Sequence, residues 1–240
     1  VEAAKAHKAD IIVGFGGGSS MDVAKLVAVL AQGTQKLADI YGIDQIEGRS
    51  LPLVQVPTTA GTGSEVTPIS IITTGETTKM GVVDAALLAD LAILDAGLTT
   101  GLPSHITAAT GIDAMVHAIE AYTSKLKKNP ISDGLARQAL LMLGGNIVTA
   151  CNDGDNLDAR RAMLIGAMLA GQAFANAPVA AVHALAYPLG GHFHIPHGLS
   201  NSLVLPHVLR FNAESAGQLY AELAVLAEQG SSAADFIAWM

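Results

Sequence analysis

Short apolar runs alternate with amphipathic stretches through the first hundred residues. Runs of this length that are rich in β-branched residues and bounded by glycine or proline are typical of buried strands. Strands are therefore predicted over Ile11–Phe15, Leu51–Val56, Ile69–Thr73 and Leu91–Leu94. Apolar positions from Met21 to Leu30 repeat with the period of a helix. Thr73–Lys79 is expected to be a hairpin or a loop between the third strand and a further β-type run, Lys79–Val83. This alternation favours an α/β unit with a parallel sheet.

Beyond Leu102-Pro103-Ser104 the pattern is helical throughout. Helices are predicted over Ser104–Thr123, Ser132–Leu143, Asn156–Asn176, Pro178–Pro188, Leu199–Phe211 and Ser215–Gln229. Turns are predicted at Asn129-Pro130 and at Gly144-Gly145. The chain is thus predicted to fold as an α/β dinucleotide-binding domain, residues 1–102, followed by an all-α metal-binding domain, residues 103–240. Both domains are expected to be incomplete, because the sequence starts without methionine and ends inside a helical pattern.

Composition narrows the classes of partner. The formal net charge is -8 and no basic run exceeds Lys127-Lys128, so nucleic acid is an unexpected partner. No apolar stretch reaches the ~20 uncharged residues that span a bilayer, and no membrane association is expected. Cys151 is the only cysteine, which favours a reducing compartment. We therefore expect a cytoplasmic protein.

Asp113 and His117 are the first candidates for metal ligands. They lie four residues apart in the predicted helix Ser104–Thr123, a spacing that puts both side chains on one face. A surface ion pair would have the same spacing, but the surrounding residues are largely apolar, and a buried carboxylate needs a partner. Glu120 follows on the same face and is expected to orient the imidazole of His117.

Two later histidines complete a candidate set. His183 lies in an apolar helical run, where a lone histidine is usually a hydrogen-bonded core residue. His197 lies between Pro196 and Gly198, at the predicted start of a helix. Three imidazoles and one carboxylate suit Fe, Zn or another first-row divalent ion, and the sequence leaves the choice of metal open.

Two glycine-rich loops are candidates for binding a nucleotide. Gly16-Gly17-Gly18-Ser19 separates the first strand from the first long helix, an arrangement that can bind pyrophosphate through backbone N–H groups. A second cluster, Pro57–Glu65, follows the strand Leu51–Val56. Either loop alone is equally consistent with a turn that binds nothing. Together they can face one crevice at the carboxyl ends of neighbouring strands.

Four segments, GGGSSMDVAK, PTTAGTGSE, TGIDAMVHAIEAY and VHALAYPLGGHFHIPHGLSN, resemble the iron-containing (group III) alcohol dehydrogenases. The resemblance runs from about Ile11 to Asn212 and implies an Fe(II) ion, with Zn(II) in some relatives, and NAD or NADP bound between the two domains. The metal ligands that it implies are Asp113, His117, His183 and His197. The cofactor contacts that it implies are Gly17, Gly18, Ser19, Asp22, Thr58, Thr59, Thr62, Ser64, Lys79 and Leu98.

The chain departs from the family pattern near the third ligand. Many relatives have a histidine, suspected to relay protons, four residues after that ligand, and here the position is Tyr187. A tyrosine with a pKa near ~10 is a poor base at neutral pH, so the sequence does not identify the residue that relays the proton. His192 and His194 supply further imidazoles, either as replacements, as contacts for an acidic substrate, or as solvated loop residues. The predicted substrate pocket contains Phe174, Asn176, Tyr187 and His194.

These expectations combine into a hypothesis of metal-dependent alcohol dehydrogenase or aldehyde reductase activity. The ion would lower the pKa of the alcohol and stabilise the alkoxide, which transfers hydride to the nicotinamide. Alternatives on the same fold are a maleylacetate reductase, a hydroxyacid–oxoacid transhydrogenase, a Zn polyol dehydrogenase and a dehydroquinate-synthase-like lyase. A non-enzymatic, metal-stabilised helical binding protein is a further alternative. The resemblance also implies a homodimer or a larger homo-oligomer.

Overall fold

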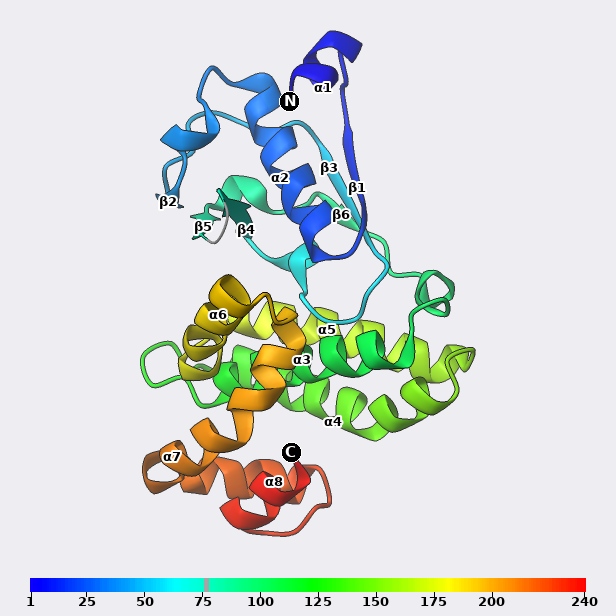
Figure 1. Ribbon diagram of the computed structural model, residues 1–240, viewed down its shortest axis with the longest axis vertical. Coiled ribbons are helices and arrows are strands. Elements are labelled where there is room, and N and C mark those ends of the chain that lie inside the picture. Colours follow the sequence, from blue (N-terminus) through cyan, green and yellow to red (C-terminus); the bar gives the residue numbers. More distant parts are fainter. Residues whose placement is uncertain (76–77) are drawn as a thin grey trace.

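An α/β part and a helical part follow one another along the chain and occupy opposite ends of the molecule (Figure 1). The computed structural model describes residues 1–75 and 78–240. The change from strands to helices falls between the short 3-10 helix η4 (Ala96–Thr99) and the helix α3 (Ser104–Tyr122). The predicted fold class is confirmed, whereas the domain limits 1–102 and 103–240 stay predictions.

A parallel sheet organises the α/β part. Its strands are β1 (Ile12–Gly16), β3 (Leu53–Pro57) and β6 (Leu91–Ala92), in the order β1-β3-β6. Helix α1 (Glu2–His7) precedes this sheet, and α2 (Gly18–Gln32) leaves the end of β1 and packs Ala24 and Ala28 near Leu53. The backbone N–H of Thr58 donates to the carbonyl of Gly16 at 2.9 Å. The loops that follow β1 and β3 are therefore side by side, as the sequence predicts.

A second, mixed sheet lies beside α2, with the strand order β2-β5-β4. Strands β4 (Ile69–Thr74) and β5 (Thr78–Val83) pair antiparallel, which agrees with the hairpin of the two predicted alternatives, and residues 76 and 77 between them lie outside the described residues. Strand β2 (Gly42–Ile43) is not predicted, because two exposed residues carry no periodic signal. Short 3-10 helices η1 (Leu37–Asp39), η2 (Ser64–Val66) and η3 (Ala85–Leu87) complete this part.

The helical part contains α3 and five further helices (Figure 1). These are α4 (Pro130–Asn152), α5 (Leu157–Asn176), α6 (Ala181–Phe193), α7 (His197–Leu226) and α8 (Ala233–Trp239). Alanine is the commonest buried apolar residue of its core, and its small side chain lets neighbouring helices approach closely. Within the described part of the chain, no single helix has the length and apolar character to cross a membrane. Helices α5 and α6 meet the requirement of length and apolar character only as a pair, and they are bent by 107° to each other.

Three helix limits differ from the prediction, and one of them is the end of α6, which continues past Pro188 to Phe193. The turn predicted at Gly144-Gly145 is wrong, because α4 continues through both residues. A Cβ at Gly144 would lie 2.5 Å from the ring of Trp239, so this glycine makes room for α8 rather than for a turn. The helices predicted as Leu199–Phe211 and Ser215–Gln229 are one continuous helix, α7, which runs through Pro206.

The two parts of the molecule touch backbone to backbone at Gly63 and Gly171. Gly63, just before η2, has a φ of 59°, and a Cβ there would lie 2.5 Å from the Cα of Gly171 in α5. Only glycine adopts this backbone freely and leaves this space. The loop after β3 is thus pressed directly onto a helix of the other part.

Lys25 of α2 is fully buried at the junction of the two sheets. Its ammonium donates to the carbonyl of Ile69 at 2.7 Å and to Oγ1 of Thr67 at 3.2 Å, and it lies 3.8 Å from the Asp22 carboxylate. Burial lowers the pKa of Lys25 to about 8, although Asp22 and Glu65 oppose the shift. The lysine therefore fixes α2 to the segment that enters β4, at a cost in desolvation.

Replacing Lys25 with methionine should change how stability depends on pH. The folded-state pKa, about 8, is below the ordinary value of 10.5, so folding releases a proton between these values. The stability that Lys25 gives is fully present above pH 10.5 and is lost as the pH falls to 8. The free energy of unfolding of wild type minus that of Lys25→Met should thus rise across this window by on the order of 3 kcal/mol. Urea titrations at several pH values measure this difference, and the exposed Lys125→Met serves as control. A difference that is independent of pH would contradict the prediction.

Candidate metal centre

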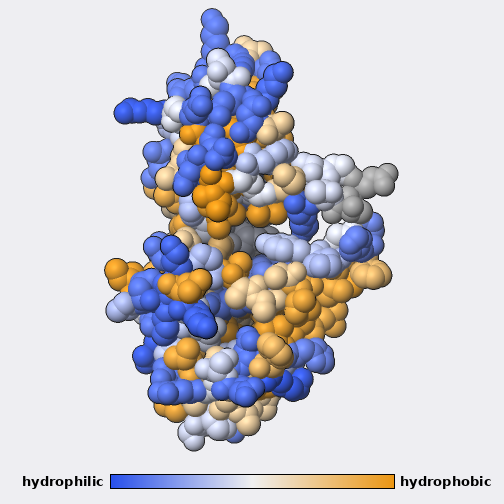
Figure 2. All heavy atoms as spheres, turned by 90° about the vertical axis from the view of Figure 1, so that its left-hand side faces the viewer, coloured by the Kyte–Doolittle hydropathy of each residue, from blue (hydrophilic) through white to orange (hydrophobic). Residues whose placement is uncertain are grey.

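A cavity of about 240 Å³ lies between the α/β part and the helical part. Figure 2 shows the molecule hollowed between these parts. One wall is formed by the start of α2, the segment from Thr62 to β4, and Lys79 of β5. The opposite wall contains all four residues predicted as metal ligands, which are Asp113, His117, His183 and His197.

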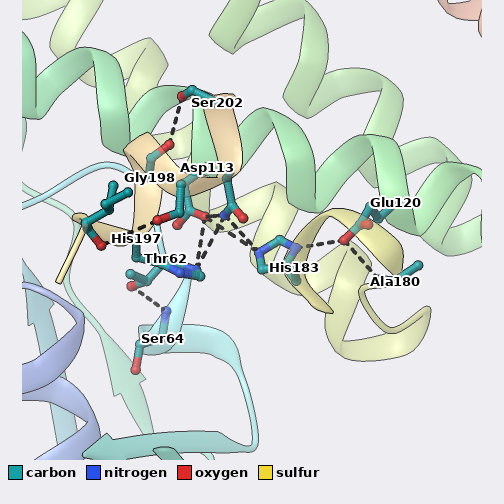
Figure 3. Close-up of polar contacts among 12 residues, drawn as sticks. Thr62, Ser64, Asp113, Glu120, Ala180, His183, His197, Gly198 and Ser202 are labelled. Atoms are coloured by element: carbon teal, nitrogen blue, oxygen red, sulfur yellow. Dashed lines mark hydrogen bonds and ion pairs between the residues drawn. The ribbon is translucent and has the colours of Figure 1, made fainter. Parts of the chain in front are cut away.

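Three of these four residues bring their donor atoms together. Asp113 lies in the middle of α3, His183 in the first turn of α6, and His197 at the first residue of α7 (Figure 3). Oδ1 of Asp113 is 3.6 Å from Nε2 of His183 and 3.5 Å from Nε2 of His197. Within the described residues, these three donor atoms all lie within 4.8 Å of one another. One small cation could contact all three.

His117 lies beside this cluster. Its ring stacks on His183, with centroids 4.7 Å apart, and on Phe174, with centroids 4.4 Å apart. The side chain is buried, and its Nδ1 has no hydrogen-bond partner among the residues that the structure describes. A buried nitrogen without a partner suits a metal ligand. The role of His117 as fourth ligand stays a prediction.

Glu120 orients His183 and not His117, so the predicted pairing is wrong. One carboxylate oxygen of Glu120 lies 2.7 Å from Nδ1 of His183 and accepts from the backbone N–H of Ala180 at 2.9 Å (Figure 3). The other oxygen accepts from the N–H of Val182 at 2.7 Å. The first turn of α6 packs against this carboxylate. The sequence of α3 alone could not predict that contact. Nδ1 of His183 is thereby the donor, which leaves the lone pair of Nε2 for an ion.

Mutual interactions set the charges of the site. Burial alone would raise the pKa of Asp113, but His117, His183 and His197 hold it below its ordinary value. Burial lowers the pKa of His117 to about 4. Burial also acts to lower the pKa of His183, but hydrogen bonds to Asp113 and Glu120 raise it to about 9. At neutral pH the site thus offers an ionised carboxylate at Asp113 and a neutral imidazole at His117, whereas His183 has to release a proton when a cation binds.

Gly198 lets α7 approach α3 closely. A Cβ at Gly198 would overlap the backbone carbonyl of Ala109, one turn before Asp113 on α3. Backbone does not yield as a flexible side chain does, so only glycine permits this spacing. The close approach of the two helices places the first turn of α7, with His197, beside Asp113.

Gly198→Ala should therefore weaken both the fold and the metal site. The added methyl group would push α7 away from α3, at a cost of about 1–3 kcal/mol in the free energy of unfolding. It would also move His197 away from Asp113. Thermal unfolding and metal titration measure the two effects. Gly145→Ala is the matched control, because a Cβ there meets nothing within 4 Å. Equal melting temperatures for Gly198→Ala and wild type would contradict the argument.

The glycine loop after β1 lines the same cavity as Asp113, His183 and His197, on the opposite wall. Gly18 and Ser19 begin α2, and a Cβ at Gly18 would lie 2.7 Å from the Thr62 side chain. Asp22 accepts from the Ser64 hydroxyl at 2.6 Å and from the Ile71 N–H at 2.9 Å, which ties α2 to η2 and β4. Of the predicted cofactor contacts, those that line this cavity are Gly18, Ser19, Asp22, Thr62, Ser64 and Lys79.

The other predicted cofactor contacts lie elsewhere. Gly17 is the N-cap of α2, and Thr59 lies against it, 3.5 Å from the position of a Cβ. Thr58 continues the same loop from β3. Leu98 lies in η4, with 37% of its side chain exposed, and does not line the cavity. These assignments stay predictions.

The predicted substrate pocket is partly assembled. Phe174 and Tyr187 line the cavity, whereas Asn176 and His194 do not. Burial raises the pKa of Tyr187, which keeps its hydroxyl protonated. His192 lines a second cavity of about 460 Å³ that shares Lys79 and Tyr187 with the first.

Asn201 is a residue of the site that the sequence reasoning missed. It is fully buried in α7, and its Nδ2 lies 2.5 Å from Oδ1 of Asp113. The four-residue spacing from His197, which places both residues on one helix face, was the available signal.

Comparisons with known proteins agree with this geometry. The family model described as iron-containing alcohol dehydrogenase matches residues 1–96. The model described as the C-terminal part of the Fe-containing alcohol dehydrogenase family matches residues 107–236.

Individual proteins match over nearly the whole chain. Long-chain-alcohol dehydrogenase 1 of Geobacillus thermodenitrificans is 48% identical over 223 residues, which cover 92% of this chain and 56% of that protein. The crystal structure of a 1,3-propanediol oxidoreductase is 39% identical with a TM-score of 0.95, over 99% of this chain and 64% of that one. Sulfoacetaldehyde reductase from Bifidobacterium kashiwanohense, solved with NAD+, is 32% identical with a TM-score of 0.92, over 99% and 63%. The chain thus spans between half and two thirds of the length of these relatives.

Proposed function

The chain belongs to the iron-containing alcohol dehydrogenase family, and on that premise we propose that it acts as a metal-dependent, NAD(P)-linked alcohol dehydrogenase or aldehyde reductase. One observation carries the proposal. The donor atoms of Asp113, His183 and His197 converge on one wall of a cavity whose opposite wall is the glycine loop at the start of α2. A metal and a dinucleotide can therefore meet over one substrate.

The proposed metal ligands are Asp113, His117, His183 and His197. Their donor set, one carboxylate and three imidazoles, suits Fe(II) and also Zn(II). A bound divalent ion would act as a Lewis acid that polarises the hydroxyl or carbonyl oxygen of the substrate. The Asp113 carboxylate supplies the negative charge of this site, and Glu120 holds His183 in the tautomer that presents Nε2.

The proposed cofactor site is the N-terminus of α2. Its first backbone N–H groups have no partners within the helix and carry partial positive charge, which favours a pyrophosphate. The absence of a side chain at Gly18 lets the phosphates approach, and the hydroxyls of Ser19 and Thr62 face the same cavity. The sulfoacetaldehyde reductase with a TM-score of 0.92 to this chain was solved with NAD+, which supports a nicotinamide dinucleotide here.

Phe174, Val179 and Ile69 form apolar walls of the cavity. Such walls exclude water from a reacting carbon, which protects a hydride in transfer. Tyr187 lies between these walls and Lys79, and its protonated hydroxyl can donate a hydrogen bond to a substrate oxygen. Because a protonated tyrosine is a poor base, we assign it to substrate orientation, and the proton leaves by another route.

The proposed assembly is a homodimer or a larger homo-oligomer. Strand β1 is an edge of its sheet, and its residues Val13 and Phe15 have 56% and 59% of their side chains exposed. An apolar edge strand of this kind usually pairs with another segment or another chain. We propose the cytoplasm as its location, because NAD(P)-linked turnover draws on the dinucleotide pool of the cell.

The test is cofactor reduction by the protein after its metal has been removed. Fe(II) or Zn(II) is added back with NAD or NADP and a panel of alcohols, and absorbance of the reduced cofactor is followed. Metal-dependent reduction is the expected result. Binding of metal and cofactor without turnover of any alcohol would refute the dehydrogenase proposal in favour of another reaction on this fold. The panel includes reduction of sulfoacetaldehyde, because one similar structure is a sulfoacetaldehyde reductase.

A further inference from the structure

Asn201 sits among the donor atoms of the metal centre and has no role in the account above. Its Nδ2 lies 2.5 Å from Oδ1 of Asp113, and 3.4 Å from both Nε2 of His183 and Nε2 of His197. The side chain is fully buried, and it comes from the first turns of α7, one turn after His197. Asn201 does not line the cavity itself. It therefore contacts the ligand atoms without being part of the cavity wall.

The neighbours of the amide decide which of its ends faces Asp113. The Asp113 carboxylate, 2.5 Å from the amide, can only accept. An amide oxygen in this place would face another acceptor, so the NH₂ group must point toward Asp113. Oδ1 then points away from Asp113, where it is buried and has no hydrogen-bond partner among residues 1–75 and 78–240. Burying an unpaired oxygen is unfavourable, so the contact with Asp113 has to compensate for it.

We propose that Asn201 is a positioning residue of the metal centre, whose amide holds the Asp113 carboxylate in the orientation that binds the ion. A carboxylate on its own can rotate about its Cβ–Cγ bond, and a short hydrogen bond to one oxygen fixes that rotation. Groups that orient metal ligands in this way typically change metal affinity by about 10–100-fold when they are removed. The inference rests on the metal centre of the proposed function and adds to it a residue outside the predicted ligand set.

The test measures metal binding without cofactor or alcohol. The intact protein is stripped of metal and titrated with Co(II), whose absorption spectrum reports the geometry of its ligands. Asn201→Ala and the bulkier Asn201→Leu both lose the amide donor, and Leu keeps the site filled. Both are expected to bind Co(II) about 10–100-fold more weakly and to give an altered spectrum at saturation. Ser202→Ala is the matched control, because Ser202 is the next residue of α7 and its hydroxyl donates to the Gly198 carbonyl.

The outcomes separate the two proposals. If both Asn201 variants bind Co(II) with an affinity within threefold of wild type, the inference is overturned, but the proposed metal centre is not. A higher affinity would overturn it too, since the amide would then compete with the ion rather than prepare its ligand. An equal loss in Ser202→Ala would assign the effect to α7 in general and also overturn it. Failure of the wild type to bind Co(II) would overturn both the inference and the metal centre. Circular dichroism of each variant identifies any that does not fold, and the other Asn201 variant then decides.

Discussion

Replacing His183 with alanine is expected to abolish metal binding and NAD(P)-linked turnover together. His183 supplies a donor atom 3.6 Å from the Asp113 carboxylate, and it links that carboxylate to Glu120. Without it, two converging donors remain, and metal content should fall to background. Loss of a Lewis acid that contributes several kcal/mol would reduce turnover by on the order of 10³-fold or more. Metal analysis and cofactor reduction on the same preparation measure both effects.

The control for this experiment is His207→Ala. His207 is an exposed residue of α7 and lies outside the cavity lining. Its replacement should leave metal content and turnover unchanged. A His183→Ala protein that keeps stoichiometric metal and turns over would refute the ligand assignment.

Glu120→Ala should cause a large loss of stability. The buried Glu120 carboxylate accepts from the N–H groups of Ala180 and Val182 and pairs with His183. Its removal leaves the N–H of Val182 and the imidazole of His183 buried without this partner, and breaking a buried pair in this way costs about 3–5 kcal/mol. Metal affinity should also fall, because His183 loses the group that fixes its tautomer. Urea titration of the metal-free protein isolates the effect on folding from the effect on the metal.

Glu120→Gln is expected to fall between wild type and Glu120→Ala, since one amide oxygen still accepts while the NH₂ group faces a donor. Glu222→Ala is a matched control, because the exposed Glu222 accepts a hydrogen bond from Tyr122 but lies outside the cavity lining. If Glu120→Ala unfolds within 1 kcal/mol of wild type, the carboxylate does not hold α6 in place.

Local patterns allowed most of the fold to be predicted. The junction of β1, the glycine loop and α2 is contiguous in sequence, and each piece carries its own signal of period or turn chemistry. The helix limits that were predicted wrongly depend on residues far away in the sequence. Gly144-Gly145 has the residue types of a turn, but Trp239 packs against Gly144 and α4 continues. Pro206 lacks an N–H group, and α7 nevertheless runs through it, with Leu205, Val208 and Leu209 buried around it.

The residues of the candidate site also fall into those that local spacing predicts and those that only the tertiary structure brings together. The pair Asp113 and His117 follows from helical spacing, and both residues are buried on one wall of the cavity. The partner of Glu120 did not follow, because the docking of α6 on α3 joins residues about sixty positions apart. Asn201 shares a helix face with His197, yet only the packing of α7 against α3 brings its amide to Asp113. Residue type and spacing thus predicted four side chains that the structure places on one wall of the cavity, whereas the groups that contact and orient them required the structure.

The contact between Gly63 and Gly171 has a mechanical consequence. No side chain lies between the two backbones, so a change of rotamer cannot increase or decrease the distance between them. Two such surfaces can still turn against each other. We expect any closure of the α/β part over a dinucleotide to be a rotation about this point, which acts as a pivot. Thr62 lies next to the pivot and lines the cavity, so its spacing from α5 should persist throughout the motion. The shape of the cavity near Thr62 would then stay the same before and after closure, while the walls farther from the pivot move.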